Sequence, residues 1–401
     1  MSSHYDVIVV GAGMVGATVA AALSQEPSLK IALVEAYPLK PISQQDPADL
    51  RVSAINRASE TLFKNLGIWQ NLIPSRLGPF TDMKVWETQS SLVHFDSADI
   101  GEAMLGHIIE NRHLQQACLS RCTQSNNIDF LCPEKPISLD DNQLELENGL
   151  KLTAKLIIGA DGARSQIRDW AEIKSKGWDY DQSGVVCTVT TEKPHLQTAR
   201  QRFLEEGPLA FLPLADPHQC SIVWSNSTEE AQLLCELSDD DFKVVLAKAL
   251  QSELGDIVDI SQRASFPLKL SHAENYVTEN VALVGDAAHT IHPLAGQGVN
   301  IGLLDAATLA EIVITAHQQG RNIGSLHTLN KYQRRRKGDN LAIQLTMDLF
   351  KRVFCSDLAP VRQARQYSFS AVNKSTLMKK LFMQQASGHR FANPDLTRDH
   401  H

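Results

Sequence analysis

The sequence has few cysteines, few aromatic residues and no long apolar run, and these shortages exclude several classes of protein. Its seven cysteines are odd in number and scattered, with no CxxC pair and no cysteine–histidine cluster at metal spacing. We therefore expect no disulfide framework and no metal site. No signal peptide precedes the first strand, and no apolar run approaches the roughly 18 residues that span a bilayer. A reducing compartment, the cytoplasm, is the simplest interpretation.

The composition is otherwise ordinary, with 43% apolar and 21% charged residues, which argues against disorder or a collagen-like chain. At roughly 150 residues per domain, 401 residues allow two or three lobes. Residues 331–390 hold thirteen Lys or Arg against three Asp, a net +10, while the whole chain carries −8. This basic segment could meet anionic lipid or an acidic partner, or be a solvated helical surface packed on an acidic body. No nucleic-acid partner is expected.

The first 35 residues read as one β-α-β unit. Residues 5–10 (YDVIVV) form a β-branched run, residues 14–24 (MVGATVAAALS) are alanine-rich, and residues 30–35 (KIALVE) form a second buried strand. This order predicts an α/β protein with a Rossmann-like nucleotide-binding fold.

Further pieces of this fold are expected later in the chain, separated by other sheet material. Residues 152–158 and 281–284 read as buried parallel strands, and residues 83–94 and 185–223 as a mostly antiparallel sheet. A helix is predicted over residues 53–66. The predicted divisions are a discontinuous nucleotide-binding domain (1–75, 105–180 and 275–330), an inserted β-sheet substrate-binding domain (76–104 and 181–274) and a helical, basic C-terminal region (331–401).

A glycine-rich loop, GAGMVG at residues 11–16, follows the first strand. Gly11 permits a sharp turn, Gly13 lets a pyrophosphate approach the backbone, and Gly16 lets the helix pack closely on the strand. Glu35 ends the next strand, where a carboxylate accepts hydrogen bonds from an adenosine ribose and repels the 2′-phosphate of NADP. The loop predicts FAD or NAD and does not choose between them.

Two later loops distinguish these cofactors. One begins at Asp161-Gly162 and continues to Arg164 and Arg168, and the other is residues 285–298 (GDAAHTIHPLAGQG). The three motifs GxGxxG, DG and GD, in this order, resemble those of the class A flavin monooxygenases of the para-hydroxybenzoate hydroxylase type. The resemblance implies one long FAD molecule, held at both ends.

The resemblance also implies roles for particular residues. Asp286 would bind the ribityl chain of FAD, and residues 293–300 would pass beside the isoalloxazine ring into a helix whose dipole stabilises reduced flavin. Arg164 and Arg168 would contact FAD or a nicotinamide cofactor, or be surface arginines of a tight turn. The predicted cofactor-binding residues are Gly11, Gly13, Gly16, Glu35, Arg51, Asp161, Gly162, Gly285, Asp286, Pro293, Gly296, Gly298 and Asn300.

Further stretches carry a closer resemblance, namely residues 50–56 (LRVSAIN), 106–111 (GHIIEN), 211–214 (FLPL), 222–224 (IVW) and 285–300. They are similar to the ubiquinone-biosynthesis hydroxylases, and most to those acting on 2-octaprenylphenol. The implied activity is hydroxylation of a polyprenylated phenol through a C4a-hydroperoxyflavin, with O₂ and NAD(P)H or another reductant as co-substrates. A sister hydroxylase acting at another ring position remains open.

The protein itself would exclude water and place the ring carbon near the reactive oxygen. Pro293 is predicted as a wall beside the flavin, Gln297 as an amide donor, and His292 as a base for the phenol. His289 could be such a base too, although both histidines could instead satisfy backbone groups. The predicted substrate-binding residues are Leu212, Pro213 and Trp224.

Three other kinds of protein share parts of this pattern. A plain NAD-dependent dehydrogenase would leave the DG and GD loops without a purpose, whereas a non-catalytic FAD-binding assembly factor and a prenyl-reducing flavoprotein remain alternatives.

A polyprenylated substrate would come from a membrane or a lipid-carrier protein, within a ubiquinone-biosynthesis complex or a homo-oligomer. The basic C-terminal region, including Arg334, Arg335 and Arg336, could then touch the inner face of the membrane.

Overall fold

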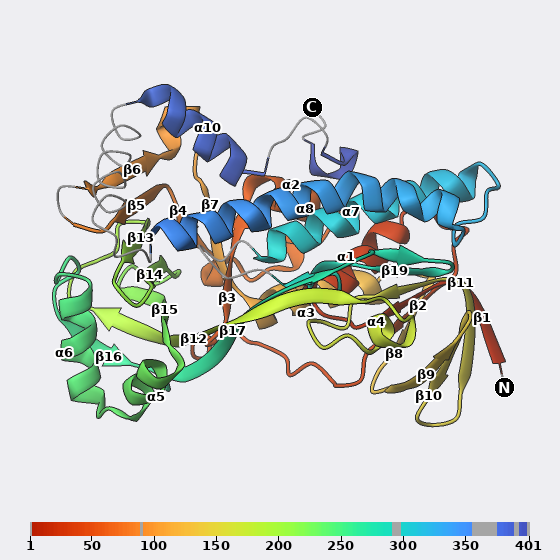
Figure 1. The fold of residues 1–401 in the computed structure, drawn as a ribbon, viewed down its shortest axis with the longest axis horizontal. Coiled ribbons are helices and arrows are strands. Elements are labelled where there is room, and N and C mark those ends of the chain that lie inside the picture. The colour runs from red at the N-terminus through yellow and green to blue at the C-terminus, as the bar shows by residue number, and fades with distance from the viewer. Residues whose placement is uncertain (1, 89–90, 291–297, 355–374, 389–392, 399–401) are drawn as a thin grey trace.

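The computed structural model describes residues 2–88, 91–290, 298–354, 375–388 and 393–398. A largely parallel sheet lies at one end of the molecule and a large antiparallel sheet at the other (Figure 1). Two long helices, α7 (Gly298–Gln318) and α8 (Leu326–Phe354), pack against each other and run across the upper half of Figure 1.

The largely parallel sheet confirms the Rossmann-like fold. Its main path runs β18-β19-β11-β1-β2-β8, and the pairs of β1 with β2 and β11, of β2 with β8, and of β11 with β19 are parallel. A hairpin of β9 and β10 extends it next to β11. The strands are β1 (Ser2–Val10), β2 (Ile31–Val34), β8 (Ile128–Leu131), β9 (Pro136–Asp140), β10 (Gln143–Leu146), β11 (Lys151–Gly159), β18 (Val277–Thr278) and β19 (Val281–Leu283).

Helix α1 (Met14–Leu23) is the buried centre of this lobe, in contact with both α7 and α3 (Asn111–Thr123). Its alanines are fully buried, because small side chains let three helices approach one another closely. The carboxyl ends of β1, β11 and β19 meet at one edge, where ligands bind in open α/β sheets. The remaining short helices of the lobe are α4 (Gln166–Trp170), η1 (Trp69–Asn71), η2 (Pro74–Arg76) and η5 (Gly285–Ala287).

A small antiparallel sheet consists of β3 (Val52–Asn56), β7 (Gly106–Glu110) and β4 (Gly78–Phe80). The prediction of one helix over residues 53–66 was therefore wrong at its start. Residues 52–56 pair with β7, and only α2 (Arg57–Asn65) is helical. The Asn56 side chain accepts a hydrogen bond from Ser59 N, which caps the helix at its true start.

The large sheet runs β20-β17-β12-β15-β14-β13-β5-β6, with β16 paired to β12. All its pairs are antiparallel except β13 with β5. The strands are β5 (Asp82–Trp86), β6 (Val93–Asp96), β12 (Ser175–Thr191), β13 (Thr198–Phe203), β14 (Pro208–Pro213), β15 (Gln219–Ser227), β16 (Ile257–Ile260), β17 (Ala264–Ala273) and β20 (His289–Thr290). The predicted division at residue 180 falls inside β12, a strand that reaches both lobes.

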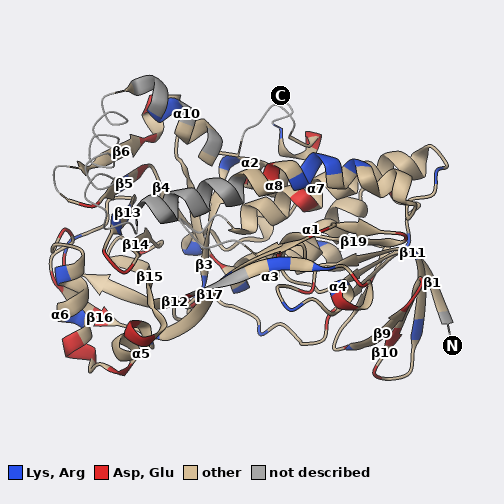
Figure 2. Cartoon of the chain, in the orientation of Figure 1, with Lys and Arg blue, Asp and Glu red and all other residues tan. Residues whose placement is uncertain are grey.

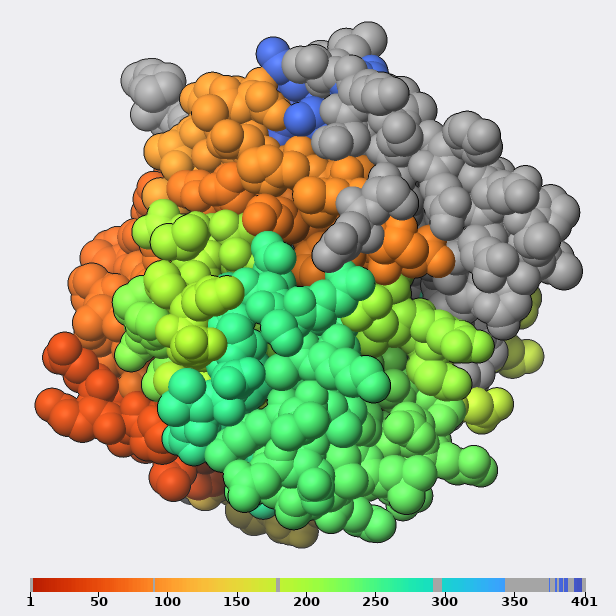
Figure 3. All heavy atoms as spheres, turned by 90° about the vertical axis from the view of Figure 1, so that its left-hand side faces the viewer, coloured from red at the N-terminus to blue at the C-terminus, as the bar shows by residue number. Residues whose placement is uncertain are grey.

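The two faces of this sheet pack against different parts of the chain. One face, with Phe211 and Trp224, is covered by α5 (Thr228–Glu236) and α6 (Asp239–Ala249). The other face, with Leu212, packs against the small sheet through Phe80 and Ile108. Figure 3 shows this end of the molecule, with the green residues of the large sheet and its helices below the orange residues of β4 to β6.

The C-terminal part contains α8, α10 (Thr376–Ala386) and η7 (Asp395–Thr397); η4 (Ser97–Ile100) contacts α10. By length and composition α7 could cross a membrane, so the expectation that no run was long and apolar enough was wrong. However, 78% of that apolar stretch is buried inside the protein, as in the core helix of a globular fold.

Candidate active site

The glycine-rich loop joins β1 to α1 and is shaped by two of its glycines. Gly11 has a φ of +98°, and a Cβ at this position would lie 2.5 Å from Ala160 O. A Cβ at Gly16 would collide with Gly11 O. Nothing lies within 4 Å of a Cβ built on Gly13, so the backbone there is open to a ligand. The assignments of Gly11 to the turn and Gly16 to packing therefore have a direct steric basis.

The N-terminus of α1 is free to bind an anion. Within the described residues Gly13 provides no side-chain cap and the first turn holds no acidic residue, so neither competes with a phosphate for the helix N–H groups. Glu35 shapes the same loop, because its Oε2 accepts a hydrogen bond from Ala12 N at 2.8 Å and its Oε1 one from Tyr37 N at 3.0 Å.

The DG loop lies directly against the glycine-rich loop, since Asp161 Cα is among the atoms nearest to a Cβ built on Gly11. Asp161 Oδ2 accepts a hydrogen bond from Ile167 N at 3.1 Å, whereas its buried Oδ1 has no partner in the described part of the chain. Such an unsatisfied acceptor is expected where a ligand donates a hydrogen bond.

Arg168 connects the DG loop to the GD loop. It is 8% exposed, and its Nη1 donates hydrogen bonds to Ala163 O and Ala287 O, both at 3.2 Å. This corrects the alternative of a surface arginine for Arg168, whereas Arg164 is exposed. The buried guanidinium fixes the distance between the two loops.

In the GD loop, Gly285 has a φ of +59° and lies against Val15 of α1. The Asp286 side chain is exposed to solvent and makes no hydrogen bond among the described residues. Desolvation by the surrounding protein raises the pKa of its carboxyl, and the charges of His289 and Arg51 partly offset this rise. Asp286 is thus an available acceptor at the edge where the three loops meet.

A buried carboxylate on α7, Asp305, lies behind the GD loop. Its Oδ2 accepts a hydrogen bond from Gly285 N at 3.2 Å and lies 2.5 Å from His289 Nε2. Its Oδ1 accepts hydrogen bonds from Arg336 Nε at 2.8 Å and Asn340 Nδ2 at 3.0 Å, both on α8. Burial alone would raise the pKa of Asp305, but the charges of His289 and Arg336 lower it to about 2. One ionised side chain therefore ties the GD loop to both long helices.

The structure describes two of the predicted cofactor-binding residues at the start of α7, Gly298 and Asn300. A Cβ on Gly298 would meet nothing within 4 Å, so this position is open. Asn300 is buried, with its Nδ2 donating to Ala54 O at 2.7 Å and its Oδ1 accepting from Asn56 N at 3.1 Å. Its side chain thus holds β3 against α7. The predicted residues His292, Pro293, Gly296 and Gln297 lie outside the described residues.

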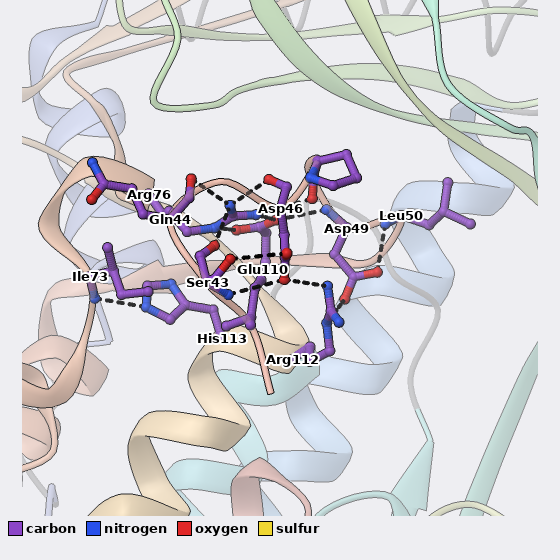
Figure 4. Close-up of polar contacts among 12 residues, drawn as sticks. Ser43, Gln44, Asp46, Asp49, Leu50, Ile73, Arg76, Glu110, Arg112 and His113 are labelled. Atoms are coloured by element: carbon purple, nitrogen blue, oxygen red, sulfur yellow. Dashed lines mark hydrogen bonds and ion pairs between the residues drawn. The ribbon is translucent and has the colours of Figure 1, made fainter. Parts of the chain in front are cut away.

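Arg51 follows a loop that a buried ion pair holds in place (Figure 4). Arg76 Nε donates to Glu110 Oε2 at 2.7 Å, and its Nη1 and Nη2 donate to Asp46 O and Pro47 O at 2.7 and 3.2 Å. Glu110 Oε1 in turn accepts from Asp49 N at 2.7 Å. The Arg51 guanidinium lies over the ring of Phe266, 5.7 Å from its centroid.

The predicted substrate residues do not share a face of the large sheet. Leu212 packs toward the small sheet, whereas Trp224 lies in the apolar cluster under α5 and α6, and both are at most 7% exposed. Pro213 is buried as well. The exposed residue beside Arg51 is Phe266 on β17, which is 40% exposed and which the sequence prediction missed.

Comparison with known proteins identifies the family. The chain matches the family described as FAD binding domain over residues 138–344. The 3-demethoxyubiquinol 3-hydroxylase of Escherichia coli is 37% identical over 387 residues, covering 96% of this chain and 98% of the relative. This chain belongs to the FAD-dependent hydroxylases. Ubiquinone hydroxylase UbiL of Rhodospirillum rubrum is 34% identical to this chain over 395 residues, covering 96% of this chain and 89% of the relative.

Solved structures agree with this fold. The p-nitrophenol 4-monooxygenase PnpA of Pseudomonas putida gives a TM-score of 0.78 at 18% identity, covering 97% of this chain and all of that chain. PqsL of P. aeruginosa gives a TM-score of 0.75 at 20% identity, covering 92% of this chain and all of that chain. The family membership makes this protein an FAD-dependent monooxygenase, for which O₂ and a reductant are co-substrates.

The residues of this chain fit FAD. The three contacting loops present four features that a ligand could use: the uncapped N-terminus of α1, the open backbone at Gly13, the unsatisfied Asp161 Oδ1 and the Asp286 carboxylate. Sequence reasoning missed Asp305 and Arg336 as supports of this site. The signal was present, because a lone acid within the apolar run of residues 299–310 requires a buried partner.

Proposed function

We propose that this monooxygenase hydroxylates the aromatic ring of a polyprenylated ubiquinone precursor. Support comes from the 37% identity with a 3-demethoxyubiquinol 3-hydroxylase over nearly the whole chain. The two candidate substrates are 2-octaprenylphenol, favoured by the sequence resemblance, and 3-demethoxyubiquinol, the substrate that the name of the Escherichia coli relative gives. A sister activity at another ring position has the same site requirements.

The FAD-binding roles follow from the free groups on the three loops. The pyrophosphate would lie at the N-terminus of α1 over Gly13, the adenosine ribose near Glu35, and the ribityl chain at Asp286. Gly11, Gly16 and Gly285 shape the backbone, while Asp161 and Gly162 support the cofactor beside them. Gly296, Gly298 and the backbone near Asn300 would border the ring system, with Arg51 beside it. Bound FAD, once reduced, supplies the activated oxygen, of which one atom enters the ring and the other leaves as water.

The chain must position the phenol and manage its proton. His289 is a poor candidate for a base, because it is 2% exposed and its Nε2 is engaged by Asp305. His292 remains the candidate base, Pro293 the wall and Gln297 the amide donor, in line with the sequence prediction. An electron-rich phenolate is the better acceptor of the oxygen atom, so a base near the hydroxyl would favour the reaction.

The wall on the substrate side would come from the large sheet. Phe266 is exposed, lies against Arg51 and belongs to the strand β17 that also pairs with β20. The buried residues Leu212, Pro213 and Trp224 would then support this wall from the interior of the lobe. In the Phe266→Ala variant we expect KM for the lipid substrate to rise with FAD content unchanged, and an unchanged KM would remove Phe266 from the wall.

We also propose a separate role for each lobe and a route by which the substrate reaches the enzyme. The parallel-sheet lobe would hold FAD, and the antiparallel sheet would receive substrate. A lipid-carrier protein, a ubiquinone-biosynthesis complex or a second copy of the chain could deliver the substrate to an enzyme located in the cytoplasm, at the inner face of the membrane.

Deletion of the gene, followed by mass spectrometry of the lipid extract, tests the function. We expect one ubiquinone precursor lacking a ring hydroxyl to accumulate, and its mass names the step. The wild-type gene should restore the quinone pool, and an Asp286→Ala variant should not. A normal pool in the deletion strain would refute the proposal. Purified protein that binds FAD without substrate-stimulated oxygen consumption would favour the assembly-factor alternative.

A further inference from the structure

A groove lies on the outer side of the long helices, away from the three cofactor loops. It has a volume of about 430 Å³ and is lined by the second half of α7, the turn after it and the exposed side of α8. Ile312 and Ala316, only 8% and 3% exposed, form its apolar floor. The residues around this floor are Glu311, Thr315, Arg321, Lys331, Arg334 and Arg335.

The charges around the groove are unbalanced. Arg335 Nη1 lies 2.7 Å from Glu311 Oε1, so these two side chains neutralise each other. Arg321, Lys331 and Arg334 have no carboxylate within 4 Å in the described part of the chain. Figure 2 shows Lys and Arg gathered on this stretch of α8. Three uncompensated cations thus surround a buried apolar surface.

The exposed side of α8 combines this charge with apolar residues. Leu326 and Leu341, near the two ends of the basic stretch, are 40% and 42% exposed. Arg336 does not belong to this surface, because it is 4% exposed and paired with Asp305, so its expected role in membrane contact was wrong. Only part of the basic segment is therefore available to a partner.

We propose that this groove binds the phosphate headgroup of an anionic phospholipid and seats α8 on the membrane surface. Unpaired cations attract the anionic headgroup, and the apolar floor with the exposed leucines suits the adjoining glycerol and acyl carbons. A free anion would use only the cations, whereas a phospholipid would use both the cations and the neighbouring apolar surface. The choice of lipid rests on the proposed function, because a polyprenylated substrate resides in the bilayer.

Vesicle co-sedimentation of the FAD-loaded full chain tests this inference. The probes are phosphatidylcholine vesicles with and without phosphatidylglycerol, and the variant is Lys331→Glu/Arg334→Glu. The matched control is Lys193→Glu/Lys248→Glu, which changes the net charge equally at exposed lysines of the large-sheet lobe. We expect wild type and control to bind only the anionic vesicles, and the groove variant to bind them at least about tenfold more weakly. FAD content should be the same in all three proteins.

Four outcomes would overturn the inference. The first is absence of wild-type binding to anionic vesicles, and the second is an equal loss in groove and control variants, which indicates general charge attraction. The third is displacement of the protein from vesicles by inorganic phosphate at matched ionic strength, which indicates a free-anion site. The fourth is competition by polyglutamate at matched ionic strength, which indicates an acidic protein partner. Hydroxylation of detergent-solubilised substrate separates the two proposals, because it tests the function without a membrane.

Discussion

His289 Nε2 lies 2.5 Å from Asp305 Oδ2, and both side chains are at most 2% exposed. The contact joins the loop that carries Asp286 to the centre of α7. Since Arg336 approaches the other oxygen of the same carboxylate, the loop, α7 and α8 share one buried charge. Removal of that charge would leave Arg336 buried without its principal counter-ion.

The Asp305→Asn variant is therefore expected to lose both stability and FAD affinity. Breaking a buried ion pair on one side reduces the free energy of unfolding by about 3–5 kcal/mol. Urea denaturation of the apoprotein and fluorescence titration with FAD measure the two effects. The double variant Asp305→Asn/Arg336→Met should recover part of the stability, because it removes the unpaired cation. Unchanged FAD affinity in Asp305→Asn would contradict a positioning role.

The same carboxylate predicts a dependence of stability on acid. Its pKa falls from 3.8 in the unfolded chain to about 2 in the fold, so ionised Asp305 stabilises the protein above pH 3.8. This contribution, on the order of 2 kcal/mol, should disappear as the pH falls from 3.8 toward 2. The free energy of unfolding measured across that range should decline less steeply in Asp305→Asn than in wild type. Some decline should persist, because Glu60 also has a pKa of about 2.

Gly13 and Gly16 should respond differently to alanine. In Gly16→Ala the new methyl group collides with Gly11 O, so the apoprotein should lose about 1–3 kcal/mol or more of stability. In Gly13→Ala the methyl group meets open space, and the apoprotein should keep its Tm. FAD affinity should nevertheless fall at least about tenfold, since the methyl group occupies the approach of the pyrophosphate. Normal FAD affinity in Gly13→Ala would show that the cofactor does not pass there.

Arg168 and Arg164 form a matched pair for the DG loop. Arg168→Met removes buried hydrogen bonds to Ala163 O and Ala287 O, so we expect a loss of about 2–3 kcal/mol and weaker FAD binding. Arg164→Met, at an exposed position, should change the stability by less than about 0.5 kcal/mol. Thermal denaturation with and without FAD measures both variants, and equal Tm shifts in the two would argue against the bridge between the loops.

Arg76→Met should loosen the loop before Arg51. The variant leaves Glu110 buried without its cation, at a cost of about 3–5 kcal/mol. Limited proteolysis should then cut within residues 43–50, while wild type resists. Arg76→Met/Glu110→Gln should be more stable than Arg76→Met alone, because no buried charge remains unpaired. A resistant loop in Arg76→Met would show that other contacts hold it.

The sequence alone predicted correctly those features that depend on residues close together in the chain. The β-α-β unit, the glycine-rich loop, the DG loop and the start of the GD loop depend on glycines and strands within a few residues of one another, and the described residues contain all of them. The helix predicted over residues 53–66 failed because the partner of β3 is β7, about fifty residues later. Asp305 and Arg336, 31 positions apart, meet only because α7 and α8 pack together. Leu212 and Trp224 were both predicted to bind substrate, but they lie on opposite faces of the large sheet, because side chains alternate along β14 and β15 and the register between these strands was unknown.

The pairing of β20 with β17 ties the GD loop to the strand that bears Phe266. His289 and Thr290, within that loop, pair with His272 and Ser271 of β17. The loop proposed to hold the flavin and the strand proposed to face the substrate therefore share one ladder. A slip of one residue in that ladder would turn Phe266 to the opposite face of the sheet. The register of β20 on β17 would thus decide whether Phe266 faces the substrate at all.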